Sequence, residues 1–434
     1  MGYGVGDFGV NLYFISMMTY LSYFYTDVFG LSAAAAAGVL LVARLVDAVT
    51  DPLMGLVMER TRSRWGRLRP HILFGAIPLG LLAVLTFTVP PGGETYKLWW
   101  AYVTYVGFGL AYTVVTIPYS ALTASMTTSH TERTVLSTVR MGCAFAGGYV
   151  ISAGMPALVG MFETEAAGYQ WSLIIYAFVA TLLLWATVYA TSERVRPRVE
   201  KNVTLAEFMK VVFINPPLLV VVILFTGSML SFTVRQTVAV YFFKYNLERP
   251  DLIGTWFQVT MPIMFIGLIF TPRIAERVGK AGGIILGALV TIASCVGMYL
   301  TPYDQIEWIF FWGCVMALGG TPLAVLGWAM LPDTVEYAQL RHGIRAEGAI
   351  FAMSSFFQKL GKSVGGAGVL AALAGAGYVA NSAQSDASID AIHNMMTLVP
   401  AAIMLVMILA ARFYTLDSAK HRSILEELAQ RERG

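Results

Sequence analysis

The sequence is poor in charged residues. Only 13% of its 434 residues are Asp, Glu, Lys or Arg, about half the share of an average soluble domain, whereas 57% are hydrophobic. This composition argues against a water-soluble enzyme and against a disordered chain. The net charge of +3 is too small to indicate a nucleic-acid partner. The apolar residues come in runs of about 20, long enough to cross a bilayer as helices, so the sequence predicts a polytopic membrane protein.

Cysteines and catalytic motifs are also scarce. Cys143, Cys295 and Cys314 lie in apolar segments at no metal-ligand spacing, and we interpret them as buried thiols. The sequence contains no phosphate-binding P-loop and no His-Glu-x-x-His helix. We therefore expect no enzyme and no cofactor, and a membrane enzyme or a sensor stays as the alternative from another functional class.

The apolar residues form twelve segments, and the longest interruption between them divides these into six plus six. This layout is typical of transporters built from two repeated halves, and it predicts an all-α polytopic membrane protein. The predicted parts are an N-terminal six-helix bundle (1–191), a cytoplasmic linker (192–216), a C-terminal six-helix bundle (217–415) and a cytoplasmic tail (416–434). The segments run near 8–29, 32–58, 71–90, 97–126, 134–162, 168–191, 217–243, 252–272, 281–302, 306–332, 347–378 and 391–414.

Basic residues gather in alternate connections. The connection 59–70 holds five arginines, and the linker, the connection 273–280 and the tail are basic as well. By the positive-inside rule we expect both termini to be cytoplasmic in a multi-pass protein of the plasma membrane. Polar and glycine residues open the chain, so we expect no cleavable signal peptide. The basic loop Arg62 to Arg69 either holds helix ends against acidic partners or serves topology alone.

The sharpest group of buried charges lies in the second segment. Arg44, Asp47 and Asp51 are spaced i, i+3 and i+7 and share one helical face, which Thr50 borders. A charge at mid-membrane costs at least about 2.5–3.5 kcal/mol, so it is a functional candidate. Two carboxylates beside hydroxyl oxygens suit a small hard cation, or they can hold a proton. The alternative is an ion-pair network that only orients helices, but one arginine cannot neutralise two aspartates.

Further polar and aromatic side chains are embedded in both halves. Arginine forks suit carboxylate, sulfonate or phosphate groups, and we expect Arg140, Arg235 and Lys359 to face a cleft. For Lys359 the alternatives are snorkelling or pairing with an aspartate of the second segment, and for Arg235 a purely structural role stays open as well. Aromatic rings beside polar groups can stack on a sugar, although packing explains each ring alone. The remaining embedded candidates are Asn11, Thr113, Thr116, Tyr119, Ser120, Gln236, Trp328 and Gln358.

Several motifs together resemble one transporter family. They are Gly2-Tyr-Gly-Val-Gly-Asp7-Phe-Gly, Tyr25-Thr-Asp27-Val, Ala43-Arg-Leu-Val-Asp47-Ala-Val-Thr-Asp51-Pro-Leu-Met-Gly55, Thr61-Arg-Ser-Arg-Trp-Gly-Arg-Leu-Arg-Pro70, Ile117-Pro-Tyr-Ser120, Asp333-Thr-Val-Glu336-Tyr, Arg345-Ala-Glu347-Gly and Gln358-Lys359-Leu-Gly. The chain resembles the glycoside–pentoside–hexuronide:cation symporters, a branch of the major facilitator superfamily that includes melibiose permease and the glucuronide carrier. The resemblance covers nearly the whole chain.

The resemblance implies a cation-coupled sugar symporter of the bacterial inner membrane with twelve helices in two bundles. The implied coupling ion is Na⁺ or H⁺, and for Na⁺ the metal ligands would include Asp47 and Asp51. We expect a monomer whose partners are the bilayer and a small-molecule sugar. The implied cation site is Asp47, Thr50, Asp51 and Thr113. The implied sugar site is Asn11, Thr116, Ser120 and Arg140, with Lys359 between the two sites and Tyr119, Arg235, Gln236 and Trp328 as further candidates.

Two departures from the family pattern bear on the substrate. Melibiose permease has aspartates where this chain has Asn11 and Thr116, and tryptophans where it has Ser120 and Ala324. Losing two anions while keeping Arg140, Lys359 and Arg235 makes the expected cleft more positive. We therefore hypothesise an acidic sugar, such as a hexuronide or a sulfonated sugar. A neutral glycoside or pentoside, or a lysolipid as in a related branch, stays as the alternative.

Overall fold

The computed structural model describes residues 2–126, 130–193, 215–342, 347–416 and 418–433. Helices make up nearly all of this part of the chain, and none of the described residues forms a strand. The prediction of an all-α protein is therefore confirmed. Most of the expected linker, from 194 to 214, and Arg345 of the quoted motifs lie outside the described residues.

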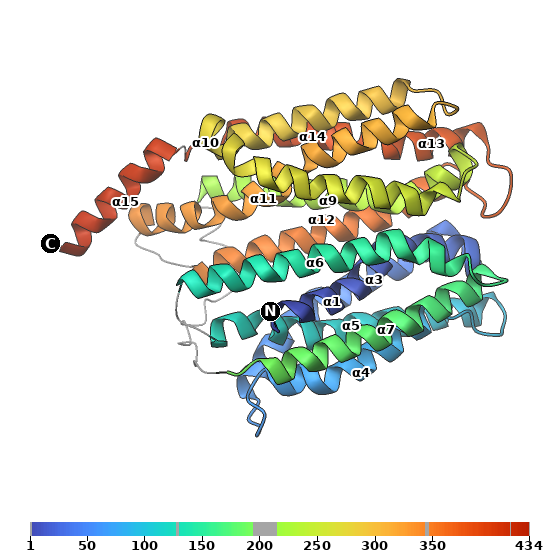
Figure 1. The fold of residues 1–434 in the computed structure, drawn as a ribbon, viewed down its shortest axis with the longest axis horizontal. Helices are drawn as coiled ribbons and strands as arrows, with labels where there is room; N and C mark the ends of the chain where they lie inside the picture. Colours follow the sequence, from blue (N-terminus) through green and yellow to red (C-terminus); the bar gives the residue numbers. More distant parts are fainter. Residues whose placement is uncertain (1, 127–129, 194–214, 343–346, 417, 434) are drawn as a thin grey trace. The chain divides into compact units, whose positions relative to one another are not determined.

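The helices of the two sequence halves are shown in Figure 1. The first half contains α1 (Gly4–Ile15), η1 (Ser16–Tyr20), α2 (Leu21–Tyr23), η2 (Phe24–Val28), α3 (Ala33–Arg60), α4 (Arg69–Thr86), α5 (Glu94–Met126), α6 (His130–Val159) and α7 (Glu165–Ala190). The second half contains α9 (Pro216–Tyr241), η3 (Phe242–Asn246), α10 (Leu252–Leu300), α11 (Ile306–His342), α12 (Glu347–Gly375), α13 (Asp386–Met396), α14 (Leu398–Arg412) and α15 (Ser418–Arg433).

These helices account for the twelve expected spans. Among the described residues, nine helical segments are long and apolar enough to cross a membrane. One of them, α10, contains two spans, because Gly279 has a left-handed φ of 77° that breaks the helix there. The remaining two spans are α12 and the continuous run Gly4–Val28, in which two short π-helical stretches interrupt the α-helix. Helices are the expected element because a bilayer leaves no water to satisfy backbone groups.

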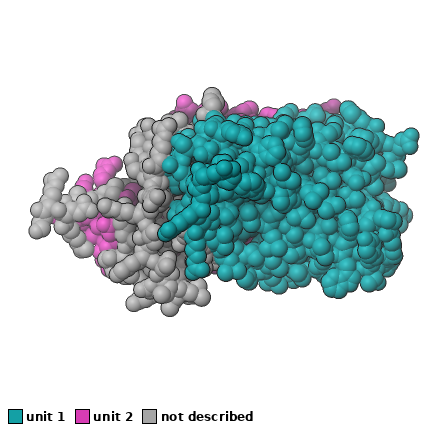
Figure 2. Space-filling model, turned by 90° about the horizontal axis from the view of Figure 1, so that it is seen from below, with its two compact units in different colours: residues 1–198, 243–258, 366–388 teal, residues 199–242, 259–365, 389–434 magenta. Residues whose placement is uncertain are grey.

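The described residues pack into two compact units, coloured teal and magenta in Figure 2. Unit 1 comprises residues 1–198, 243–258 and 366–388, and unit 2 comprises 199–242, 259–365 and 389–434. Unit 1 therefore includes two segments from the second half of the sequence. The predicted N-terminal bundle (1–191) and C-terminal bundle (217–415) are based on the sequence segments and differ from this grouping by contacts. The division into these bundles stays a prediction.

Within unit 1, α1 packs against α6 and α7, while α5 packs against α3 and α4. Gly147 of α6 permits a close approach of α1, because a Cβ there would lie 2.6 Å from the main-chain oxygen of Phe8. Small residues at such crossings bring polar side chains of neighbouring helices within reach of one another. Within unit 2, α9 packs against α11 and α14 around a core that includes Phe225 and Leu331.

Candidate substrate and cation sites

The two aspartates of α3 face α5. Arg44 Nη1 donates to Asp47 Oδ2 at 2.9 Å, and Thr113 Oγ1 of α5 donates to Asp51 Oδ1 at 2.8 Å. Arg44 Nη2 also donates to the Tyr105 hydroxyl at 3.1 Å. The helices approach closely here, since a Cβ at Gly109 would lie 2.7 Å from Asp47 Oδ1. The structure thus brings Asp51 and Thr113 together, as the family resemblance implied.

One carboxylate oxygen of this group has an unfilled hydrogen-bonding capacity. Asp47 Oδ1 is buried, and no described residue donates a hydrogen bond to it. Buried polar atoms nearly always have a partner, so a bare carboxylate oxygen fits a bound cation or a proton. The Thr50 hydroxyl donates within its own helix, to the Val46 oxygen at 3.0 Å, and keeps its lone pairs. The donor set, carboxylate and hydroxyl oxygen, suits Na⁺ as well as H⁺.

A second polar group in unit 1 centres on Arg140 of α6. Its Nε donates to Asp7 Oδ2 of α1, and its Nη2 donates to Ser120 Oγ of α5 at 3.3 Å. The guanidinium carbon lies 5.2 Å from the centroid of the Tyr119 ring. Asn11 Nδ2 donates to the main-chain oxygen of Asp7 at 2.8 Å. Three expected sugar-site residues, Asn11, Tyr119 and Ser120, therefore contact the Asp7–Arg140 pair.

Asp7 is a member of this group that sequence reasoning left out. It is only 7% exposed and forms an ion pair with Arg140. Asp7 belongs to the first quoted motif, but it precedes the expected start of the first apolar segment and was not counted among the buried charges. The charge balance expected for the cleft therefore needs correction, because Arg140 is already neutralised. Thr116 donates only to the Tyr112 oxygen of its own helix, at 2.8 Å.

The other candidates belong to unit 2. The guanidinium of Arg235 is half-buried, its Nε donates to the Ser231 oxygen at 3.3 Å, and no described carboxylate forms an ion pair with it. Gln236 is buried, and its Nε2 has no partner among the described residues. Trp328 is 39% exposed and packs edge-on against Phe225 at 5.1 Å between ring centroids. Lys359 lies exposed on α12.

A third polar group, also in unit 1, was not expected as a site. This Asp27 cluster consists of Asp27, Lys244, Tyr245, Tyr378 and Asn381. Lys244 Nζ donates to Asp27 Oδ1 at 2.9 Å, the Tyr245 hydroxyl donates to the same oxygen, and the Tyr378 hydroxyl donates to Oδ2 at 2.6 Å. The Asp27 side chain is completely buried.

The chain segments in the Asp27 cluster lie far apart in the sequence. Asp27 is in η2, Lys244 is in η3, and both elements are π-helices, which are frequent at functional positions. Asn381 has a left-handed φ of 56°, and its Nδ2 donates to the main-chain oxygen of Asp27 at 2.5 Å. Asp27 was part of a quoted motif, but nothing in the sequence indicated Lys244 as its partner.

The basic loop before α4 contacts a glutamate, as one of the two expectations for it proposed. Glu193 accepts hydrogen bonds from the backbone nitrogens of Arg67, Leu68 and Arg69 at 2.9, 2.8 and 3.1 Å. The main chain at the start of α4 makes these contacts, so the carboxylate satisfies free N–H groups of a helix terminus. In unit 2, Lys280 forms an ion pair with Asp333 at 2.7 Å. Burial beside Asp333 raises the pKa of the Tyr414 hydroxyl, which donates to that carboxylate.

Comparison with known proteins decides the family. The model of the family described as MFS/sugar transport protein matches residues 2–418. The chain belongs to this family. An uncharacterised symporter, YnaJ of Bacillus subtilis, is 36% identical over 100% of this chain and 95% of its own length. The isoprimeverose transporter of Lactiplantibacillus pentosus is 34% identical, with 99% of this chain and 90% of the relative covered. A putative sulfoquinovose importer of Escherichia coli is 29% identical, with 99% and 93% covered.

Solved structures agree on the fold of this sugar transporter. A mutant of the nucleoside transporter NupG aligns with a TM-score of 0.70 at 12% identity, covering 96% of this chain and 99% of that chain. At that identity the likeness concerns the fold alone. The expected major facilitator fold and the resemblance to sugar symporters are both confirmed.

Proposed function

We propose that this sugar transporter is a cation-coupled symporter of the bacterial inner membrane that works by alternating access. Its coupling cation binds at Asp47 and Asp51, with oxygen atoms of Thr50 and Thr113 as further ligands. The observation that supports this most strongly is the buried Asp47 Oδ1, which no described residue satisfies. Both termini are proposed to be cytoplasmic, and the transporter is proposed to act as a monomer.

The cation acts by neutralising one face of α3. Arg44 pairs with Asp47 through Oδ2 and Thr113 donates to Asp51, whereas no described residue donates to Asp47 Oδ1. An uncompensated charge inside a membrane is costly, and a cation removes that cost. Sugar and cation then stabilise the same loaded state, and each raises the affinity of the other by the same factor.

The sugar hydroxyls are proposed to bind at the Asp7–Arg140 pair. A carboxylate accepts hydrogen bonds from hydroxyl groups and a guanidinium donates to them, so this pair serves any sugar. Asn11, Ser120 and Tyr119 extend the same surface. Lys359, Gln236 and Trp328 stay proposed as further sugar-binding residues.

The acidic character of the substrate is proposed to depend on Arg235. Arg140 is paired with Asp7, whereas Arg235 has no carboxylate partner among the described residues. A half-buried guanidinium without a counter-ion favours a ligand with a carboxylate or sulfonate group. Relatives named as putative sulfoquinovose importers are consistent with this, and the relative named as an isoprimeverose transporter is the reason to test other sugars.

The Asp27 cluster is proposed to hold one end of the transport path closed. It joins η2 to two segments from the second half of the sequence through a completely buried carboxylate. Opening that end would separate Asp27 from Lys244 and from Tyr378. Because a buried charge without its partner is strongly unfavourable, such contacts break together rather than one by one.

The test is uptake by the purified protein in proteoliposomes, with a panel of labelled sugars and with either a Na⁺ or a proton gradient. We expect a gradient of one cation to drive accumulation, and glucuronides or sulfosugars to compete better than methyl galactoside. Competition by methyl galactoside alone would contradict the acidic substrate. Uptake that ignores both gradients would contradict coupling.

A further inference from the structure

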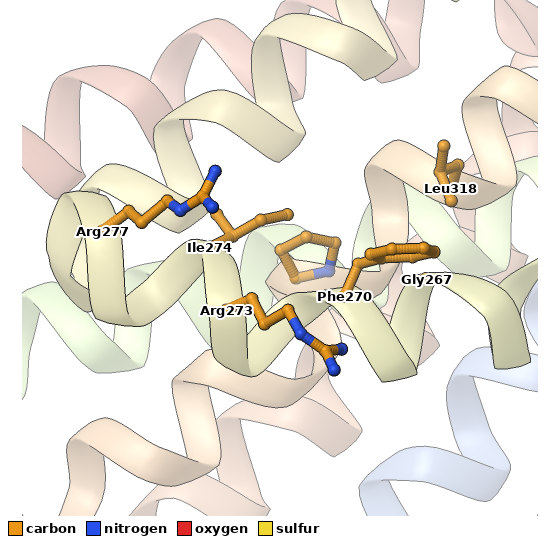
Figure 3. A pocket seen from close by; sticks show the side chains of 7 residues that line it. Gly267, Phe270, Arg273, Ile274, Arg277 and Leu318 are labelled. Atoms are coloured by element: carbon orange, nitrogen blue, oxygen red, sulfur yellow. The ribbon is translucent and has the colours of Figure 1, made fainter.

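A cavity of about 430 Å³ lies between α10 and α11 of unit 2, and none of its lining residues is assigned above to transport. Figure 3 shows the side chains that line it. Five come from α10 and two from α11. They are Gly267, Phe270, Arg273, Ile274, Arg277, Leu318 and Pro322. The α10 residues follow a helical spacing of three and four, so they form one face of that helix.

The cavity combines two arginines with an apolar end. In Figure 3 Arg277 lies far from Leu318, whereas the Arg273 side chain extends back toward Phe270. Phe270 is 51% exposed and Leu318 is 40% exposed, so protein does not cover the apolar end. Apolar surface of this kind in a membrane-spanning helix is contacted by lipid chains.

Within the described parts of the chain, no carboxylate pairs with either arginine of the cavity. Neither Arg273 nor Arg277 forms an ion pair with a described carboxylate. Arg273 Nη1 donates only to the Ile269 oxygen, at 3.2 Å. The next cation along the chain differs, because Lys280 is bound to Asp333. Gly279 breaks α10 just beyond Arg277, so both arginines belong to the last turns of the helix before that break.

We propose that this cavity binds the headgroup of an anionic phospholipid. The two guanidinium groups contact the phosphate, and the acyl chains run along Phe270, Ile274 and Leu318. Two arginines without a carboxylate partner among the described residues, next to an exposed apolar wall, match a molecule that has an anionic end and a hydrocarbon end. Free phosphate would not contact the apolar wall, and a sugar would place its hydroxyl groups against side chains that cannot form hydrogen bonds with them. Basic pockets between membrane helices are suited to such headgroups on the negatively charged leaflet.

The test is a lipid titration of the full-length protein in a neutral detergent, followed by native mass spectrometry. The probes are phosphatidylglycerol, phosphatidylcholine and inorganic phosphate. We expect the wild type to retain phosphatidylglycerol and to bind it much more tightly than phosphatidylcholine. The double variant R273Q/R277Q should lower the affinity for phosphatidylglycerol about 30-fold, since each arginine near a negative headgroup contributes about one factor of five.

Two further variants separate the pocket from general charge. Arg341→Gln removes an exposed arginine of α11 that does not line the cavity, and it should leave the affinity unchanged. Leu318→Trp keeps both arginines and fills the apolar end, and it should weaken binding as well.

The proposal is overturned by any of four results. These are equal affinity for the two lipids, an unchanged R273Q/R277Q variant, an equal loss in Arg341→Gln, or displacement of phosphatidylglycerol by inorganic phosphate at a similar concentration. If R273Q/R277Q does not fold, the Leu318→Trp titration decides in the same way, because unchanged binding there contradicts a lipid in the cavity.

Discussion

Two groups of buried carboxylates in unit 1 differ in how well the protein satisfies them. Both oxygens of Asp27 accept hydrogen bonds, and Lys244 supplies a matching charge. In the α3 pair, one oxygen of Asp47 has no donor among the described residues, although Arg44 pairs with the other oxygen. A carboxylate satisfied by protein groups fixes a structure, whereas one left short of partners is suited to a ligand. The difference separates a proposed closing contact from a proposed binding site.

The largest effect is expected at the group that is short of partners. Asp51→Asn removes one of the two negative charges, so the cation should no longer raise the affinity for sugar. We expect cation-driven accumulation to disappear, a loss comparable to the 5- to 150-fold coupling seen between linked sites, while downhill exchange continues. Uptake in proteoliposomes measures both. The matched control is Asp251→Asn, in an exposed ion pair with Arg249, and uphill uptake that survives in Asp51→Asn removes this residue from the cation site.

The next largest effect is expected in the Asp27 cluster, where both carboxylate oxygens accept hydrogen bonds. Lys244→Met leaves the Asp27 carboxylate buried without its charge partner, which costs about 3–5 kcal/mol. We expect a lower melting temperature and a higher reactivity of a cysteine placed at the exposed Ser382. The double variant with Asp27→Asn should recover part of the loss, because both charges are then absent. A double variant as unstable as the sum of the single ones would mean that the two residues are not coupled.

A smaller effect is expected at Arg235, the residue proposed to distinguish acidic from neutral sugars. Arg235→Gln should weaken the binding of an acidic sugar by about 10- to 100-fold, the fold-change that corresponds to the loss of one hydrogen bond to a charged group. The affinity for a neutral sugar should be nearly unchanged. Inhibition constants of both sugars, measured in the same vesicles, give the ratio. The Arg341→Gln variant controls for general charge. An equal loss for both sugars would assign Arg235 to structure rather than to specificity.

The smallest effect is expected at the exposed pair. The Arg249 guanidinium lowers the pKa of the Asp251 carboxyl. The ion pair therefore stabilises the folded protein at neutral pH, and this stabilisation is lost only as the pH falls through the lowered pKa of Asp251. Arg249→Gln should raise the pKa of Asp251 toward its ordinary value without changing transport at pH 7. A titration of Asp251 followed by NMR measures the shift, and altered transport at neutral pH would show that this loop has more than a surface role.

Much of the fold was predictable from the sequence because hydrophobic length determines where helices cross a bilayer. The α3 face was also predictable, since helical spacing alone places Arg44, Asp47 and Asp51 together. Contacts between distant segments were not. No local pattern relates Asp27 to Lys244, and Asp7 lies so near the chain start that its pairing with Arg140 depends on the packing of α1 against α6. Because Asp7 pairs with Arg140, the proposal of an acidic sugar depends on Arg235.

The central claim is that one cation and one sugar bind in mutual dependence through the α3 carboxylates. The most direct measurement is the affinity of the purified protein for its sugar with and without the cation, and for the cation with and without the sugar. Linkage requires the same factor in both directions, and Asp51→Asn should reduce that factor to one. Sugar affinity that does not change with the cation in the wild type would contradict the account.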